Sequence, residues 1–228
     1  MRIPITRYGL PQVAVFPAIV VALMLIALAL GLKFKFGPYS IIIIETVLLL
    51  VLIWVLAFFR DPSRAIPAGT DILISPADGV VSDVEILEDA PYIGGKAIRI
   101  GIFLNVFNVH INRVPCAVRI EKIEYKEGLF KNAIAPESAQ VNESNAVTMT
   151  RLNEPKDKLV VRQISGAIAR RIVCEAKPGD EYASGDQFGM IKFGSRTELY
   201  LPFRESAKCQ VKVGDKVKAG LTIMVRYQ

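Results

Sequence analysis

The distribution of hydrophobic and polar positions divides the chain into two parts. Residues 13–32 are twenty consecutive residues without a formal charge, and residues 40–59 are twenty more that include a single glutamate. A helix of about 20 residues spans the roughly 30 Å hydrocarbon core of a bilayer. A glycine and a proline lie between the two runs, and both residue types interrupt helices. The pattern predicts a membrane-anchoring hairpin in residues 1–60, with helices at about 12–32 and 40–59.

Residues 61–228 follow a different pattern, in which short alternating runs are bounded by Gly, Pro, Asp and Asn. This alternation is typical of strands joined by turns. We expect strands at residues 79–87, 96–103, 117–125, 146–152, 158–164, 190–193, 198–201 and 221–227. In residues 165–174 the apolar positions recur at helical spacing, which predicts one helix. The fold class expected after the hairpin is mainly β with minor α, a β-sandwich or barrel-sandwich-like domain.

A repeated spacing near the C-terminus supports this expectation. Gly179 and Asp180 are followed by Gly185, and a second Gly-Asp pair at 214–215 is followed by Gly220 at the same spacing. Gly-Asp turns of this kind join short strands in flattened β-sandwich folds of the biotinyl/lipoyl-carrier type. The likeness concerns an element of a fold, and it carries no function by itself.

The distribution of charge favours a lipid surface over a nucleic acid as partner. The chain has 28 Lys and Arg against 22 Asp and Glu. Six of these cations and two of these anions precede residue 65, so residues 65–228 carry 22 cations and 20 anions. A nucleic-acid-binding domain concentrates its basic excess in the folded part, whereas basic segments beside membrane helices attract anionic lipids. Four cations flank the outer ends of the hairpin against two in its connection, which places the following domain on the cytoplasmic side of the cell membrane.

Two further features favour a chain that is not exported. A cleaved signal peptide is the alternative explanation of the first apolar run, but this run exceeds the roughly 7–15 residues of a signal core and a second run follows it. Cys116, Cys174 and Cys209 match neither a disulfide framework nor a zinc-site spacing. We expect free thiols in a reducing compartment.

The most informative segment is residues 185–202, GDQFGMIKFGSRTELYLP. It resembles the phosphatidylserine decarboxylase proenzymes, in the short bacterial and archaeal branch of the pyruvoyl-dependent family, which cut themselves at a Gly-Ser bond in this setting. Three more segments match the family in the same order: SPADGVV at 75–81, NVHINRVP at 108–115 and VRQISG at 161–166. The similarity spans roughly residues 60–228, and the two-helix anchor fits the same branch.

The resemblance implies self-cleavage between Gly194 and Ser195. Because glycine has no Cβ, it does not obstruct the tetrahedral intermediate that forms when the Ser195 hydroxyl attacks the preceding carbonyl. Elimination and hydrolysis then leave a pyruvoyl group at residue 195 and release ammonia. The resulting fragments, 1–194 (the β chain) and 195–228 (the α chain), are expected to stay together as a heterodimer, with further oligomerisation left open.

A serine hydroxyl needs a neighbouring base that a third group orients. His110 is the only histidine of the chain, and Asp78 in the family-like Asp-Gly turn is the expected partner that fixes its tautomer. The expected catalytic residues are therefore Ser195, His110 and Asp78. Some family members carry a second histidine three residues after the first. This chain has Arg113 at that position, so His110 would serve both self-processing and decarboxylation.

For the mature enzyme, the resemblance implies a carboxy-lyase that converts phosphatidylserine to phosphatidylethanolamine. The pyruvoyl ketone takes the electron-sink role that pyridoxal phosphate has elsewhere, so neither pyridoxal phosphate nor a metal is expected. The candidates for binding the lipid phosphate or the serine carboxylate are Arg113, Arg196 and Lys192, because cations bind such oxyanions. The expected partners are a membrane phospholipid and the bilayer, with no nucleic acid.

Other interpretations stay open at this level. A pyruvoyl-dependent decarboxylase acting on a different amine, either an ether-linked serine phospholipid or a soluble amino acid, would use the same chemistry, although a soluble substrate does not need the hairpin. A membrane-tethered adaptor or carrier of the barrel-sandwich type would not need the Gly194–Ser195 context. Glu143 falls where the family has a polar cluster, and a solvated loop is the alternative explanation there.

Overall fold

The computed structural model describes residues 5–131, 138–166, 171–192 and 195–228. The chain separates into two compact units, Met1–Pro62 and Ser63–Gln228. The core of the second unit contains no described residue from the first. Each unit can therefore be considered by itself.

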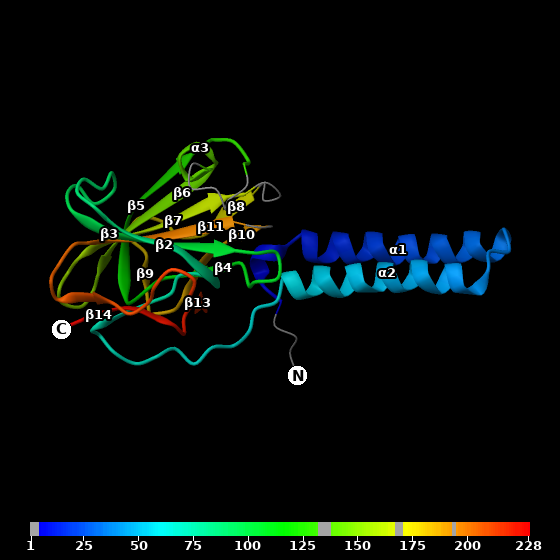
Figure 1. Ribbon diagram of the computed structural model, residues 1–228, viewed down its shortest axis with the longest axis horizontal. Coiled ribbons are helices and arrows are strands. Elements are labelled where there is room, and N and C mark those ends of the chain that lie inside the picture. Colours follow the sequence, from blue (N-terminus) through cyan, green and yellow to red (C-terminus); the bar gives the residue numbers. More distant parts are fainter. Residues whose placement is uncertain (1–4, 132–137, 167–170, 193–194) are drawn as a thin grey trace. The chain divides into compact units, whose positions relative to one another are not determined.

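The first unit is a helical hairpin made of α1 (Gln12–Lys33) and α2 (Pro38–Phe58), preceded by a short 3₁₀ turn, η1 (Arg7–Gly9). The two helices lie side by side and run in opposite directions (Figure 1). Near the turn a Cβ at Gly31 would lie 2.9 Å from Ile41, so the close approach requires glycine there. The predicted pair of apolar helices is confirmed.

Both helices are apolar on every side, and most of their side chains are exposed. In water such a surface is unfavourable, since each helix has no polar face to turn outward. By length and composition both helices can cross a membrane. The hairpin is therefore suited to an apolar environment.

In its described residues the second unit forms three antiparallel sheets, and its fold is mainly β, as predicted. The largest sheet has eight strands, in the order β13 (Lys216–Val217), β2 (Gly79–Leu87), β3 (Ala97–Leu104), β11 (Ser195–Pro202), β7 (Lys158–Ser165), β6 (Ser144–Arg151), β5 (Val118–Lys126) and β9 (Glu181–Tyr182). Two smaller sheets contain β1 (Ile72–Ile74), β14 (Ile223–Tyr227) and β12 (Ala207–Cys209), and β4 (Ile111–Arg113), β10 (Gln187–Lys192) and β8 (Arg171–Cys174). A single helical turn, α3 (Ser138–Val141), precedes β6.

Each of the eight predicted strands overlaps an observed strand, and residues 79–87 match β2 at both ends. The predicted helix at residues 165–174 is wrong where the structure describes it, because β7 continues to Ser165 and β8 pairs with β10. Residues 167–170 of that helix lie outside the described part of the chain. β-Branched side chains in this segment favour a strand over a helix, and this preference outweighed the apparent helical spacing.

The repeated Gly-Asp spacing corresponds to a repeated backbone geometry. Gly179 and Gly214 both have φ of 93°, a conformation that favours glycine. The Gly179 N–H donates to Ile120 at 2.8 Å, and the Gly214 N–H donates to Val81 at 2.9 Å. Each turn is thus fastened to a strand of the large sheet.

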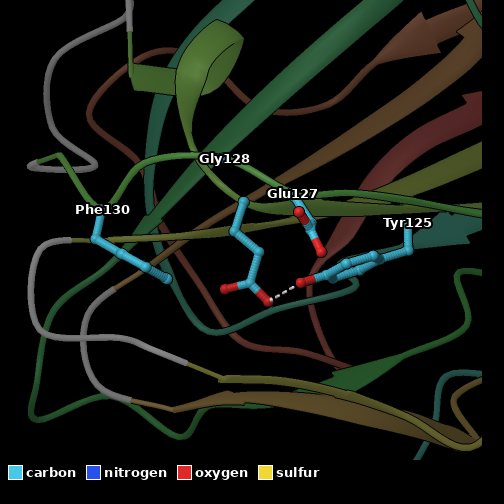
Figure 2. Close-up of a pocket in the computed structure, with 5 residues that line it drawn as sticks. Tyr125, Glu127, Gly128 and Phe130 are labelled. Carbon is cyan, nitrogen blue, oxygen red and sulfur yellow. Dashed lines mark hydrogen bonds between the residues drawn. The ribbon is translucent and has the colours of Figure 1, made fainter.

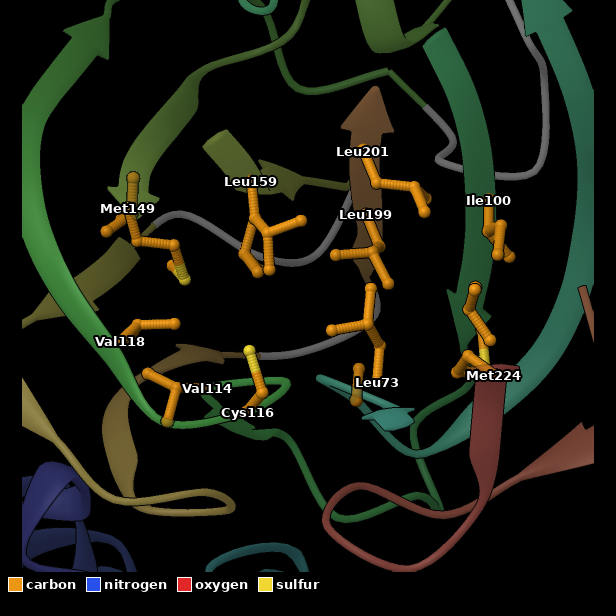
Figure 3. Close-up of a cluster of buried hydrophobic side chains, with 14 of the residues drawn as sticks. Leu73, Ile100, Val114, Cys116, Val118, Met149, Leu159, Leu199, Leu201 and Met224 are labelled. Atoms are coloured by element: carbon orange, nitrogen blue, oxygen red, sulfur yellow. The ribbon is translucent and has the colours of Figure 1, made fainter. Parts of the chain in front are cut away.

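The hydrophobic core lies between the large sheet and the sheet that contains β1 and β14. Leu199 and Leu201 of β11 point into it, and Leu73 and Met224 contribute from the opposite layer (Figure 3). Cys116 is buried in the same core, and burial raises the pKa of its thiol to about 11. Its thiol and those of Cys174 and Cys209 are free, as predicted.

Because side chains alternate along a strand, the other face of β11 carries Arg196, Glu198 and Tyr200. Glu198 is fully buried, and its carboxylate accepts hydrogen bonds from Arg196 Nε at 2.9 Å and from the Tyr200 hydroxyl at 2.8 Å. Arg162 of β7 adds a third bond at 3.3 Å. These partners offset the cost of removing the Glu198 charge from water. One face of β11 is therefore apolar beyond Thr197, and the other is a buried ion network.

Candidate active site

Ser195 is the first residue of β11, and it is fully buried. Its Cα partners are Leu104 on β3 and Ser165 on β7. Directly opposed residues of antiparallel strands point to the same side with Cβ atoms about 4.5–5.5 Å apart, so the Ser195 and Ser165 side chains lie side by side on one face of the sheet. Neither hydroxyl has a hydrogen-bond partner among the described residues. Gly194, the other half of the predicted cleavage site, lies outside the described residues.

A buried hydroxyl without a partner costs about 1–3 kcal/mol of desolvation, and native proteins rarely leave one. Two such groups that lie side by side point to a site that chemistry or a ligand uses. Ser165 was not among the residues predicted from the sequence. That Ser165 lies opposite Ser195 could not be inferred from the sequence, because residues 165–174 were interpreted as a helix.

A network of buried amides holds β11 in place beside this serine pair. Gln163 donates to Asn112 Oδ1 at 2.9 Å and accepts from Asn145 Nδ2 at 3.0 Å, and Asn112 donates to the Thr197 hydroxyl at 3.1 Å. All four side chains are almost fully buried. The network therefore joins β4, β6 and β7 to β11 two residues after Ser195.

His110 lies immediately before β4 and is fully buried. Its carbonyl accepts the N–H of Ile191 at 3.2 Å, which attaches it to β10, the strand that precedes the Gly194–Ser195 bond in the chain. Its Nδ1 lies 3.0 Å from the Asn108 carbonyl oxygen. Since a carbonyl only accepts, Nδ1 carries the proton in this bond. In the neutral ring the lone pair is then on Nε2.

Asp78 does not form the hydrogen bond that fixes the His110 tautomer. Its carboxylate binds the Arg64 guanidinium through both oxygens, at 2.6 and 2.9 Å, and it also accepts the Ala219 N–H at 2.8 Å. The expectation that Asp78 fixes the His110 tautomer is thus corrected, because the Asn108 carbonyl fixes it in this structure. Arg64 was missed from the sequence, where no local pattern connects it to a residue fourteen positions away.

The structure nevertheless brings together the two predicted segments that contain His110 and Asp78. The Arg113 N–H donates to the Pro76 carbonyl at 3.0 Å, and the Asn112 side chain also approaches that carbonyl, at 3.5 Å. These bonds fix the segment after His110 against the loop before Asp78. The role of Asp78 as a catalytic residue stays a prediction.

The three candidate cations have different surroundings. The Arg196 guanidinium is on the face of β11 opposite Ser195, where it binds Ser82, Asp83 and Glu198 at 2.7–2.9 Å. Alternation along the strand turns Arg196 away from the serine pair, and a substrate-binding role for this residue stays a prediction.

Arg113 and Lys192 end the strands β4 and β10, which pair with each other in one of the smaller sheets. Arg113 Nη1 donates to the Gly185 carbonyl at 2.9 Å, and this bond stabilises the turn that contains Gly185. Lys192 ends β10, is buried, and is the Cα partner of Arg171. Burial lowers the pKa of Lys192, and the Arg171 charge lowers it further. A substrate-binding role for either residue stays a prediction.

The fold and the site define a class of protein: a β-sandwich domain that follows an apolar hairpin and holds a buried, unpartnered serine at the start of a central strand. Within this class, the chain belongs to the phosphatidylserine decarboxylase family. The model of that family matches residues 51–225, which include every residue of the site described above.

Individual relatives agree with this assignment. The chain is 44% identical over 182 residues to the phosphatidylserine decarboxylase proenzyme of Desulfotalea psychrophila, a match that covers 80% of this chain and 83% of that protein. The proenzyme of Rhodopirellula baltica is 41% identical over 223 residues, 97% of this chain and 90% of its own length. The proenzyme of Burkholderia cenocepacia is 40% identical over 225 residues, 98% of this chain and 96% of its own. The last two matches include the hairpin.

The amide network yields a stability prediction. Gln163→Leu should destabilise the protein by about 2–5 kcal/mol, because it leaves the amide of Asn145 and the carbonyl of Asn112 buried without that partner. Gln210→Leu, at an exposed position, should change the free energy of unfolding by less than about 0.5 kcal/mol. Urea unfolding of both variants in detergent provides the comparison. Equal stability of the two variants would show that the network does not hold β11 in place.

Proposed function

We propose that the chain is a phosphatidylserine decarboxylase proenzyme, which cleaves itself between Gly194 and Ser195 and then removes CO2 from phosphatidylserine to give phosphatidylethanolamine. The observation that carries this proposal is the position of Ser195. In a member of the family, a buried serine without a hydrogen-bond partner begins a central strand. The proenzyme names of the relatives support a cleavage step.

In self-processing, the Ser195 Oγ attacks the Gly194 carbonyl carbon while His110 Nε2 accepts the hydroxyl proton. The peptide C–N bond breaks, and the nitrogen of residue 195 takes a proton, which leaves an ester between the two residues. Loss of the Ser195 Cα proton then releases the carboxylate of fragment 1–194. Water replaces the nitrogen of residue 195, ammonia leaves, and a ketone remains. The tautomer that Asn108 holds supports the role of Nε2 as base.

The residues around position 195 fit a pyruvoyl group. Both Ser195 and its Cα partner Ser165 are fully buried, and the Ser165 hydroxyl, which has no partner among the described residues, can donate a hydrogen bond to a new carbonyl oxygen. The group supplies an electrophilic carbonyl that binds the substrate amine and takes up the electrons of the bond to CO2. His110 then returns a proton to the carbon that CO2 has left. Lys192, a buried lysine at the end of β10, is a candidate for the substrate carboxylate.

The two fragments stay together in this account. Fragment 195–228 begins with β11, which pairs with β3 on one side and with β7 on the other. Its last strand, β14, pairs with β1 of the first fragment. Separation would expose both the apolar core and the backbone groups of a central strand, so cleavage yields a stable heterodimer. The hairpin would hold this heterodimer at the bilayer, with the β domain on the cytoplasmic side.

The first test is cleavage itself. The wild-type chain should run in a denaturing gel as two fragments that correspond to residues 1–194 and 195–228, whereas Ser195→Ala should remain a single chain. Ser206→Ala, in the same fragment, should be cleaved like the wild type. A wild-type protein that decarboxylates phosphatidylserine while uncut would overturn the proposal.

The second test concerns the base. His110→Ala should reduce the rate of cleavage at least about a hundredfold, the usual contribution of general acid–base catalysis. Asp78→Asn should have a smaller effect on that rate, because Asn108 holds the His110 ring, but it should destabilise the fold by breaking the ion pair with Arg64. The cleavage half-life and the unfolding midpoint separate the two effects. Rapid cleavage in His110→Ala would exclude this histidine as the base.

The third test concerns the hairpin. A chain that begins at residue 61 should fold and cleave itself, because the hydrophobic core of the β domain is built from residues after the hairpin. It should fail to float with phosphatidylglycerol/phosphatidylethanolamine vesicles in a density gradient, whereas the full-length chain should float. Equal flotation of the two chains would remove the hairpin as the anchor.

A further inference from the structure

Three buried oxygens without a partner in the described part of the chain belong to neighbouring residues on β11, on β7 and just before β6. They are Ser195 Oγ, Ser165 Oγ and Glu143 Oε2. Ser195 is the Cα partner of Ser165, and the Ser165 N–H donates to the Glu143 carbonyl at 2.9 Å. Neighbouring strands lie about 4.7–4.9 Å apart, so the Glu143 backbone is about 10 Å from that of Ser195. These residues connect the scissile serine to a buried carboxylate.

This carboxylate opens into a cavity of about 270 Å³ at the end of β5, lined by Tyr125, Glu127, Gly128, Phe130 and Glu143 (Figure 2). The Tyr125 hydroxyl donates to Glu143 Oε1 at 2.9 Å, and this bond raises the pKa of Tyr125. Glu143 is 7% exposed, and its second oxygen, Oε2, has no partner among the described residues. Oε1 of Glu143 is thus held in place by Tyr125, while Oε2 can accept a hydrogen bond from a ligand.

The cavity lies on the same face of the sheet as Ser195. Tyr125 is the Cα partner of Asn145, Asn145 of Gln163, and Gln163 of Thr197. Directly opposed residues point to the same side, so Tyr125 shares a face with Thr197 and therefore with Ser195. The chain just after β5 packs closely against the segment that carries Glu143, since a Cβ at Gly128 would collide with the backbone of residues 141–143.

The residues that line the cavity favour the binding of a cation with several N–H donors. Glu127 and Glu143 supply two carboxylates, Tyr125 and Phe130 supply two aromatic rings, and none of the five lining residues is cationic. Aromatic faces and carboxylates stabilise an ammonium group, whereas a phosphate or a carboxylate would be repelled. A primary ammonium has three N–H donors, one of which can fill the vacant position at Glu143 Oε2.

We propose that this cavity binds the primary ammonium group of the serine phospholipid and that Glu143 Oε2 accepts its proton. In this step an N–H bond of the ammonium breaks and an O–H bond forms on Glu143, which leaves a neutral amine and a neutral carboxylic acid. The lone pair exposed in this way is what attack on a carbonyl at residue 195 requires. Ser165 lies between the two positions, with a hydroxyl able to donate and accept along the path. The inference rests on the proposed function for the identity of the amine.

The direct test measures binding in the uncleaved Ser195→Ala chain, which carries no reactive carbonyl. In detergent micelles, short-chain phosphatidylserine should bind at least about tenfold more tightly than its N-acetylated analogue, because only the free ammonium group can form the charged hydrogen bond with Glu143. Adding Glu143→Gln should abolish this preference, and adding Glu124→Gln, on an exposed part of β5, should preserve it. Equal binding of the two lipids by Ser195→Ala would overturn the proposal.

A second measurement separates this inference from the proposed function. In the processable chain, Glu143→Gln should be cleaved as fast as the wild type, but at pH 7 it should turn over phosphatidylserine about tenfold more slowly. The deficit should shrink as the pH approaches the pKa of the free amine, because the substrate then loses its proton without help. An uncleaved Glu143→Gln chain, or a deficit that does not change with pH, would contradict the assignment to Glu143.

If Glu143→Gln fails to fold, Tyr125→Phe provides the same readout, because Tyr125 is largely exposed and the substitution removes only the hydroxyl that holds Glu143. It should lower turnover several-fold without affecting cleavage. Unchanged turnover in Tyr125→Phe would count against the cavity. Failure of wild-type cleavage would instead refute the proposed function, while the preference of the Ser195→Ala chain for the free amine would be unaffected.

Discussion

The pairing of β11 with both β3 and β7 is the interaction on which the rest of the structure depends. It places Ser195 in the interior of the domain, opposite Ser165, and it fixes by alternation which side chains share that face. The residues that follow on the same side join the amide network and then the apolar core, while Arg196 and Glu198 form an ion network on the other side. A strand held on both edges can carry an unpartnered hydroxyl at its start, because the remainder of the strand stabilises its position.

The same pairing explains how a chain can be cut at this point and remain one protein. The bond at 194–195 precedes the first residue of β11, so cleavage there leaves the pairs from Arg196 onward in place. Both products keep their share of the core. Self-cleavage in this account changes the chemistry of one residue while it leaves the fold intact. The tautomer of His110 is set by the backbone carbonyl of Asn108, two residues earlier in the chain.

Much of this arrangement could be predicted from the sequence, because the signals were local. The apolar runs gave the hairpin, alternation gave the strands, and the Gly-Ser motif gave the position of Ser195. What could not be predicted depends on pairs of residues distant in sequence. Arg64 binding to Asp78 and Ser165 lying opposite Ser195 follow from the topology, which no local spacing encodes. Strands of two or three residues, such as β9 and β13, were missed because they are too short to show a period.

The central claim is that residue 195 loses its serine hydroxyl and its amino nitrogen and becomes a carbonyl. The most direct measurement is the intact mass of fragment 195–228 from active protein, before and after treatment with an aminooxy reagent that labels ketones. The account predicts an N-terminus without a free amine and the addition of one label per fragment. A fragment that retains an N-terminal serine and takes up no label in active protein would contradict it.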